Sequence, residues 1–161
     1  AQDDAPVALN DIADVSSDAV ATLTVLGNDT DVDAGPLAIA TIEGTAVAAG
    51  ESVTLSSGAR VTLNADGTVS YDPNGAFDSL VSPATAAATG ASNGTATDSF
   101  VYTLNGGSLG QVLVTVTGVD GPGDRLVATP GAGPVTGTTA ADLIMADVAG
   151  DVTVSGGQGD D

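Results

Sequence analysis

The residues with the clearest chemical potential form a short polar run, NDTDVD, at residues 28–33, directly after a strand-like segment. Oxygen ligands at alternate positions of a turn can fold around one hard cation, as in the first half of an EF-hand loop. The bidentate glutamate that closes an EF-hand loop is missing, since the nearest Glu is Glu43. Any calcium site must therefore be completed from elsewhere in the fold, and the alternative is that the run only caps a turn. The ligands that we expect it to contribute are Asn28, Asp29, Asp31 and Asp33.

Three further carboxylates could complete this calcium site. Asp72, Asp78 and Asp98 lie at the ends of strand-like segments, near turns. Carboxylates at such positions can converge on one cation from several loops. The sequence DPNG at residues 72–75 is also a good turn by itself, so a purely structural role for these acids stays open.

A second kind of ion site is suggested by two similar tripeptides, DAP at residues 4–6 and DGP at residues 120–122. They lie 116 residues apart (120 minus 4), which is the spacing of one domain in a tandem array. Acids at these positions would lie where one module meets the next. We therefore expect Asp4 and Asp120, with Asp3 as a further candidate, to bind ions at module junctions, and plain turn residues are the alternative.

Composition excludes several classes of catalytic site. The chain has no Cys, no His and no Trp, and its only two cationic side chains are Arg60 and Arg125. Without Cys or His, no Ser-His-Asp or Cys-His nucleophile and no ordinary zinc site can be built. Without Lys, there is no Schiff base and no P-loop lysine. Paired carboxylates can hydrolyse glycosides, but two Tyr and two Phe leave few sugar platforms, so we predict that the chain is not an enzyme.

The formal net charge is -19 for 161 residues. This charge repels phosphate backbones and anionic headgroups, so we expect no nucleic acid and no membrane surface among the partners. No apolar run approaches the roughly 20 residues that span a bilayer, so we also expect no membrane insertion. All but two of the 21 acids are Asp, whose short side chain favours turns in which carboxylates share a calcium ion. Solvated turn residues are the alternative.

Short alternating segments between turns predict the fold. Apolar and polar residues alternate with a period of two in at least six segments, and no segment has a helical period. Two hairpin turns, ADG at residues 65–67 and NGG at residues 105–107, contain the glycines that positive φ favours. These features predict an all-β, Ig-like antiparallel sandwich. The expected strands are 21–26, 37–42, 60–64, 68–71, 99–104 and 112–117.

Residues 82–97 interrupt this pattern. They are small, uncharged and low in complexity, and the AAA run at residues 86–88 lacks an amphipathic period. We interpret the segment as a long surface loop and a tolerated insertion, because the entropy of closing a loop depends weakly on its length. A functional loop is the alternative.

Five separated blocks follow one another in a distinctive order: DAPV with ND (4–7, 10–11), VLGNDTDVD (25–33), GTVSYDPNGAFDSL (67–80), TDSFVYT (97–103) and VTVTGVD (114–120). In this order they closely resemble the VCBS-type, cadherin-like Ig repeats of very large bacterial surface proteins. The resemblance covers residues 3–122. It departs at residues 82–97, where the family has a shorter connection, and at Gly121, where an acidic residue or Asn is usual. It implies a tandem module of adhesins and biofilm proteins that is stiffened by calcium.

The tail has a different character. The sequences GTTAADLI at residues 137–144 and GGQGDD at residues 156–161 resemble the nonapeptide calcium-binding repeats of RTX proteins. Acids recur in the tail with the nine-residue period of that parallel β-roll, although its glycine turns are degraded. A Gly-rich linker is the alternative, and with so few apolar side chains we expect the isolated tail not to order by itself. The ligands implied by the resemblance are Asp142, Asp151 and Asp161, with Asp160 beside the last.

These observations predict a cadherin-like sandwich over residues 3–122, a linker over 123–136 and a degenerate RTX-like segment over 137–161. The expected function is that of a calcium-stabilised structural or adhesive module of a large secreted bacterial surface protein, in cell adhesion, biofilm or a surface layer. Its partners would be neighbouring repeats of the same polypeptide or copies of itself. The alternatives are a lectin-like module that binds cell-surface glycans, and an accessory domain of a secreted RTX toxin or enzyme. The RTX resemblance implies an extracellular or cell-surface location that is reached by type I secretion.

Overall fold

The computed structural model describes residues 4–121, 124–128, 135–136, 143–146 and 154–155. The chain divides into two compact units. The sandwich unit comprises residues 1–15, 19–76 and 97–115. The second unit comprises residues 16–18, 77–96 and 116–161.

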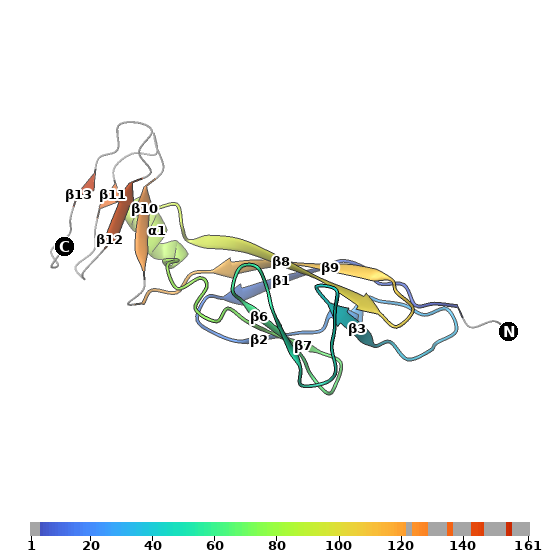
Figure 1. Ribbon diagram of the computed structural model, residues 1–161. Coiled ribbons are helices and arrows are strands. Elements are labelled where there is room, and N and C mark those ends of the chain that lie inside the picture. The colour runs from blue at the N-terminus through green and yellow to red at the C-terminus, as the bar shows by residue number, and fades with distance from the viewer. Residues whose placement is uncertain (1–3, 122–123, 129–134, 137–142, 147–153, 156–161) are drawn as a thin grey trace. The chain divides into compact units, whose positions relative to one another are not determined.

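Two sheets form the sandwich unit (Figure 1). All three pairings within the smaller sheet are antiparallel, as are the pairings of β3 with β4 and β8 in the larger one. The larger sheet contains, in order, β1 (Asp11–Ser16), β9 (Leu109–Thr117), β8 (Thr95–Leu104), β3 (Ile39–Ile42) and β4 (Thr45–Ala46). The smaller sheet contains, in order, β2 (Ala21–Leu23), β7 (Val69–Asp72), β6 (Arg60–Leu63) and β5 (Ser52–Thr54).

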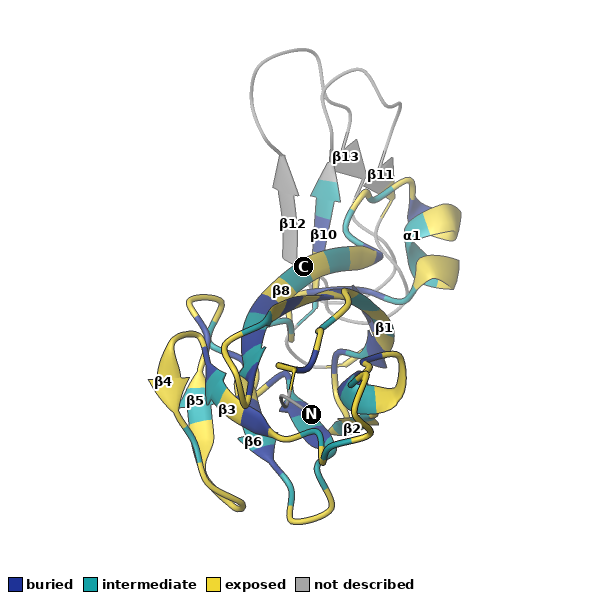
Figure 2. Ribbon diagram, turned by 90° about the vertical axis from the view of Figure 1, so that its right-hand side faces the viewer, coloured by how far each residue is buried: buried dark blue, intermediate teal, exposed yellow. Residues whose placement is uncertain are grey.

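The core of the sandwich unit follows from the period of two along its strands. Val112 and Val114 of β9 are fully buried, while Leu113 between them stays about half exposed. Val69 and Tyr71 of β7 are likewise buried, with Ser70 between them only partly covered. Figure 2 shows buried residues, in dark blue, on strands of both sheets, such as β6 and β8. One face of each strand therefore supplies the core and the other meets solvent.

The predicted all-β sandwich is confirmed, and each of the six predicted strands overlaps an observed one. The segment 21–26 is shorter as a strand than predicted, because Val25–Gly27 form a 3-10 turn. Three strands of the sandwich unit, β1, β4 and β5, were not predicted. In β1, Ile12 is 87% exposed and only Val15 is buried, so the strand lacks a clear apolar alternation. The strands β4 and β5 are two and three residues long, too short to show a period.

The interpretation of residues 82–97 as a loop is wrong for residues 83–89, which form helix α1 (Pro83–Thr89) in the second unit, and for residues 95–97, which begin β8. Ser82 is its N-cap, and the Ser82 side chain accepts a hydrogen bond from the Thr85 backbone N–H. Proline follows at the first helical position, and Gly90 ends the helix in the left-handed conformation at φ 79°. The cap residues at its two ends therefore define this helix. A short, Ala-rich helix of seven residues can form without an amphipathic period.

The second unit also contains four short strands that pair in parallel. The strand β10 (Arg125–Ala128) pairs with β12 (Leu143–Ala146), and β11 (Val135–Thr136) pairs with β13 (Val154–Ser155). Paired residues lie 18 residues apart in the first pair (143 minus 125) and 19 in the second (154 minus 135). The sequence predicted that the tail does not order by itself, whereas the structure has these four strands in it. The strands β10 and β11 also lie within the stretch that the sequence assigned to a linker.

Candidate functional site

The predicted calcium run, residues 28–33, follows the 3-10 turn at Val25–Gly27 and divides into two parts. Asp29 is only 7% exposed and points into the sandwich unit. Its Oδ1 accepts a hydrogen bond from the Leu9 backbone N–H at 2.7 Å. Asn28 is exposed, and its side-chain amide donates to the Asn10 backbone carbonyl at 3.1 Å. Asn28 and Asp29 thus fasten the N-terminal segment to the sandwich.

The hydroxyl of Tyr102 is the main partner of Asp29. It lies 2.9 Å from Oδ2 and 3.1 Å from Oδ1 of the Asp29 carboxylate. Three more oxygens surround the same hydroxyl: the backbone carbonyls of Leu9 (3.1 Å) and Val25 (3.3 Å) and the Asp11 carboxylate (3.2 Å). A phenol carries one proton, so it can donate to only one of these acceptors at a time. The site is therefore rich in oxygen acceptors and poor in protons.

Electrostatics at this site follow from burial. Burial of Tyr102, followed by its hydrogen bond to Asp29, raises the pKa of the phenol above its ordinary value, so the hydroxyl keeps its proton. Burial also raises the pKa of Asp11, and the negative charge of Asp29 adds to this effect. Hydrogen bonds from Tyr102 and Asn28 oppose the increase for Asp11 but do not cancel it. The ionised form of Asp11 is thus penalised in the folded protein.

The outer part of the run lies near the N-terminal segment. The Asp33 backbone N–H donates to Oδ1 of Asp31 at 2.8 Å, and the Asp4 backbone N–H donates to Oδ2 of Asp33 at 2.6 Å. Asp31 folds over Gly35, where an added Cβ would lie 2.9 Å from its Oδ2. A pocket lined by Asp4, Asp31 and Gly35 adjoins these contacts. The structure therefore brings together Asp4, Asp31 and Asp33 of the predicted ligands, apart from Asn28 and Asp29.

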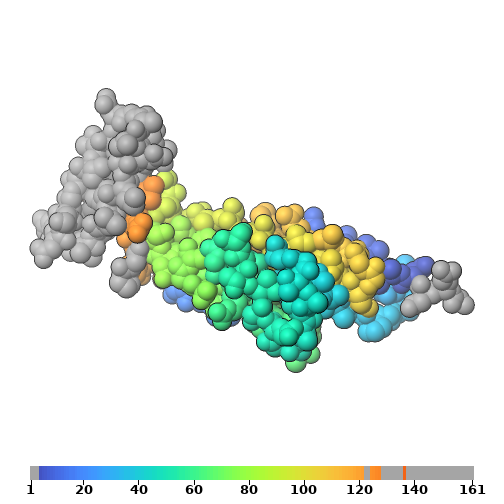
Figure 3. Space-filling view, in the orientation of Figure 1, coloured from blue at the N-terminus to red at the C-terminus, as the bar shows by residue number. Residues whose placement is uncertain are grey.

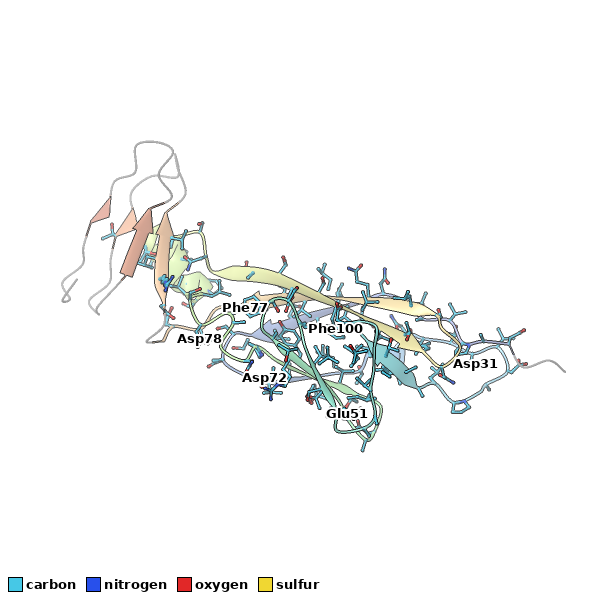
Figure 4. The ribbon with its side chains drawn as sticks, in the orientation of Figure 1. Asp31, Glu51, Asp72, Phe77, Asp78 and Phe100 are labelled. Atoms are coloured by element: carbon cyan, nitrogen blue, oxygen red, sulfur yellow. The ribbon has the colours of Figure 1, made fainter. Side chains whose placement is uncertain are left out.

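Asp72 and Asp98 do not join either group. Asp98 accepts hydrogen bonds from the hydroxyls of Tyr71 at 2.6 Å and Ser57 at 2.8 Å. Burial, followed by this bond to Asp98, raises the pKa of Tyr71 above its ordinary value. Asp72 accepts from the backbone N–H of Asn74 at 2.9 Å, which is the turn role left open by the sequence. Figure 4 shows Asp31 and Asp72 in separate parts of the sandwich unit.

Asp120 belongs to the second unit and binds the start of α1. Its Oδ1 accepts from the Ser82 backbone N–H at 2.7 Å, and its Oδ2 accepts from the hydroxyls of Ser82 and Thr85 at 3.0 and 2.8 Å. The bond from the Ser82 backbone, followed by that from Thr85, lowers the pKa of Asp120 below its ordinary value. The carboxylate is therefore held ionised at the N-cap of the helix.

The same unit contains a pocket that gathers several acids. Asp78, which Figure 4 labels, lines this pocket. Asp124 lines it too, and its Oδ2 accepts a hydrogen bond from the Gly121 N–H at 2.8 Å. Among the described residues, however, no group of three or more acidic side chains has the arrangement of a metal site. The predicted ligands Asp142, Asp151 and Asp161, with Asp3 and Asp160, lie outside the described residues. The acids that line the pocket are Asp18, Asp78, Asp120 and Asp124.

Two residues that matter most for this geometry were not predicted as site residues. Tyr102 and Asp11 both stood inside the quoted sequence blocks, in TDSFVYT and ND, yet nothing in their local pattern indicates that they meet. They are 91 residues apart, and only the larger sheet, in which β9 lies between β1 and β8, brings them within hydrogen-bonding distance. The face of the sandwich unit seen in Figure 3 has no deep cleft over the described residues.

Comparison with known proteins places most of the chain in one family model. The family model described as "Bacterial cadherin-like domain" matches residues 3–121, which include all strands of the sandwich unit. No curated protein matches the chain. Within the described part of the chain, no helix is long and apolar enough to cross a membrane.

Proposed function

The chain belongs to the bacterial cadherin-like domain family, and from this membership we propose that it is a calcium-stabilised spacer or adhesive module of VCBS type. Domains of this family are non-catalytic structural modules of bacterial surface proteins. The proposal adds an extracellular, cell-surface location that is reached by type I secretion. It also adds neighbouring repeats, or copies of the same chain, as partners, with a role in cell adhesion, biofilm or a surface layer.

The observation that carries the calcium proposal is the meeting of Asp4, Asp31 and Asp33. The backbone N–H groups of Asp4 and Asp33 donate to the Asp33 and Asp31 carboxylates at 2.6 and 2.8 Å, and these bonds link the three residues although Asp4 and Asp33 are 29 residues apart. Carboxylates in one loop system repel each other. The chain has a net charge of -19 and only two cationic side chains that could offset this repulsion. A calcium ion removes that repulsion and takes oxygen ligands from carboxylates, backbone carbonyls and water. The N-terminal segment would then be locked to the loop at residues 31–33.

The tail supports a second, separate calcium proposal. Its strands β10 to β13 alternate between two parallel pairs, and each pair joins residues 18 or 19 positions apart. Two successive nonapeptides make 18 residues, so this offset favours the RTX-like β-roll implied by the resemblance over a plain linker. In this proposal Asp142, Asp151 and Asp161 bind calcium between successive turns.

The calcium proposal is tested by thermal unfolding in EGTA and in millimolar calcium. One site at a calcium concentration 100 times its dissociation constant adds roughly 2.7 kcal/mol, which raises Tm on the order of 10 °C for a domain of this size. The double variant Asp31→Asn/Asp33→Asn should lose this rise. It should also melt higher than the parent chain in EGTA, since two repelling charges are gone.

The matched control is the double variant Asp14→Asn/Asp66→Asn. It removes the same charge from two exposed positions, one on β1 and one in the hairpin turn before β7. This control should keep the full calcium-dependent rise in Tm. An equal rise in both double variants, or no rise in the parent chain, would contradict the proposal.

A further inference from the structure

One edge of β10 is occupied by chain that is not a strand. The Arg125 N–H donates to the Ser79 carbonyl at 3.3 Å, and the Arg125 carbonyl accepts from Nδ2 of Asn93 at 2.5 Å. The Val127 N–H donates to Oδ1 of Asn93 at 3.1 Å, and the Val127 carbonyl accepts from the Ser92 N–H at 3.0 Å. All four backbone polar groups of Arg125 and Val127 are thus hydrogen-bonded to three residues from outside the strand.

The opposite edge of β10 belongs to β12. Successive residues of a strand direct their backbone polar groups to alternate edges, so Leu126 serves the edge opposite to Arg125 and Val127. The strand β12 pairs with β10 in parallel, with Leu126 opposite Ile144. Leu126 itself is 2% exposed. The strand β10 therefore has a strand on one edge and a non-strand segment on the other.

The Asn93 side chain takes the place of a peptide group on a neighbouring strand. Its amide presents one acceptor to the Val127 N–H and one donor to the Arg125 carbonyl, as a peptide C=O and N–H would. The same amide nitrogen also donates to the Ser79 carbonyl at 2.9 Å. A side chain can offer this pair of groups without adding a further strand that would have an open edge of its own.

The segment that carries Asn93 is itself held in place. The Asn93 carbonyl accepts from the Val81 N–H at 3.2 Å, and the Gly94 carbonyl accepts from the Gly118 N–H at 2.9 Å. At Gly118 an added Cβ would lie 2.1 Å from the Val81 carbonyl oxygen, so only glycine permits this approach. The helix α1 between Val81 and Asn93 is fixed by its own cap and by Asp120. Figure 2 shows α1 and the segment after it next to β10.

We propose that residues 79–94 are a cap that closes one edge of β10 and templates the first strand of the parallel stack. Stacked repeats need terminal caps, because an open strand edge pairs with other chains. The cap gives the parallel strands a defined starting edge, so that they can extend only from the side of β12. This inference uses the parallel strands of the tail but depends on neither calcium nor adhesion.

Residue-resolved amide hydrogen exchange of the 161-residue chain tests the cap. In the Asn93→Leu variant the Val127 N–H and the Arg125 carbonyl lose their hydrogen bonds to the Asn93 amide, so protection of the Val127 amide should fall about 10-fold or more. Ser92→Ala is the matched control. It removes the Ser92 hydroxyl, which donates to the Val127 carbonyl at 3.3 Å, but keeps the Ser92 backbone N–H on that carbonyl and the Asn93 acceptor of the Val127 N–H. This variant should therefore leave Val127 protection within about 2-fold. Amides of β8, such as that of Tyr102, are the internal reference and should keep their protection in both variants.

The Asn93→Asp variant tests the same contact by titration. An ionised Asp offers only acceptors, whereas a protonated Asp offers one donor and one acceptor, as Asn does. At pH 7 one oxygen of the ionised Asp would face the Arg125 and Ser79 carbonyls, which accept from the amide nitrogen of Asn93, and this repulsion should displace the side chain from the Val127 N–H. Relative to the parent chain, Val127 protection in this variant should therefore be low at pH 7 and recover at pH 3, below the ordinary Asp pKa of about 3.9. Loss of protection at the β8 amides would reveal that Asn93→Leu fails to fold. In that case the titration of Asn93→Asp tests the cap by itself.

Three results would overturn the cap: an unprotected Val127 amide in the parent chain, equal protection in Asn93→Leu, or no recovery of Asn93→Asp at pH 3. The ratio of Val127 protection in each variant to that in the parent chain should be the same in EGTA and in calcium. Failure of the proposed calcium site would instead change the calcium dependence of Tm and leave these ratios intact.

Discussion

Replacing Tyr102 by Phe removes one hydroxyl from the most densely hydrogen-bonded point of the sandwich unit. The ring of Tyr102 is fully buried, and Phe keeps its volume. The Asp29 carboxylate loses its hydroxyl partner at 2.9 Å and retains the Leu9 N–H at 2.7 Å. Since Asp29 is only 7% exposed, water replaces the lost donor poorly.

The expected loss follows from the charge on Asp29. A hydrogen bond to a charged group contributes roughly 1.5–3 kcal/mol, so Tyr102→Phe should lower the free energy of unfolding by about 2 kcal/mol. One effect opposes this loss. The hydroxyl also lies 3.1 and 3.3 Å from the carbonyls of Leu9 and Val25, and it cannot donate to them while it donates to Asp29. Removing the hydroxyl relieves its close contacts with these two carbonyl oxygens. The loss of unfolding free energy should therefore stay below the upper end of the range for a hydrogen bond to a charged group.

Tyr71→Phe is the matched control, because Tyr71 is equally buried and its hydroxyl also donates to a carboxylate. That carboxylate, on Asp98, keeps the Ser57 hydroxyl and the Ser99 N–H at 2.8 and 2.9 Å, and it is less buried than Asp29. We expect a loss of about 1 kcal/mol for Tyr71→Phe. Urea unfolding followed by far-UV circular dichroism, at pH 7 in EGTA, measures both. Equal losses, or a larger loss for Tyr71→Phe, would refute the argument from burial of Asp29.

Two further predictions concern charge and close contact. The raised pKa of Asp11 means that its ionised form opposes folding above the unfolded pKa of 3.8 and that this penalty disappears as pH falls below that value. Asp11→Asn should therefore raise the free energy of unfolding at pH 7 and have no such effect at pH 3, as urea unfolding at both pH values would show; equal effects at both would contradict it. Gly118→Ala should cost about 3 kcal/mol, because the new Cβ would lie 2.1 Å from the Val81 carbonyl oxygen. Gly121→Ala, whose Cβ meets nothing closer than 3.9 Å, should stay within about 0.5 kcal/mol in the same assay, and similar values for the two would count against the close approach.

Local patterns were sufficient to predict most of the sandwich. The hairpin turn at residues 65–67 has Gly67 at φ 85°, and the turn at residues 105–107 has Gly106 at φ 106°, as the sequence predicts for these glycines. The strands on either side show the alternation that buries one face, so their existence can be read without knowing their partners. The helix α1 also has local signals, in Ser82, Pro83 and Gly90, which the absence of an apolar period obscured.

The sequence by itself determined the residue types at the candidate site but not which way they point. Composition excluded Ser-His-Asp and Cys-His nucleophiles and ordinary zinc sites and left carboxylates, and the run at residues 28–33 placed several of them together. Only the tertiary structure separates Asp29 from Asp31. Asp29 turns inward because Tyr102, 73 residues away on β8, brings a proton donor into the core at that point. Neighbouring carboxylates repel each other, so each turns toward the nearest donor, and the donors' positions depend on strand pairing between distant segments.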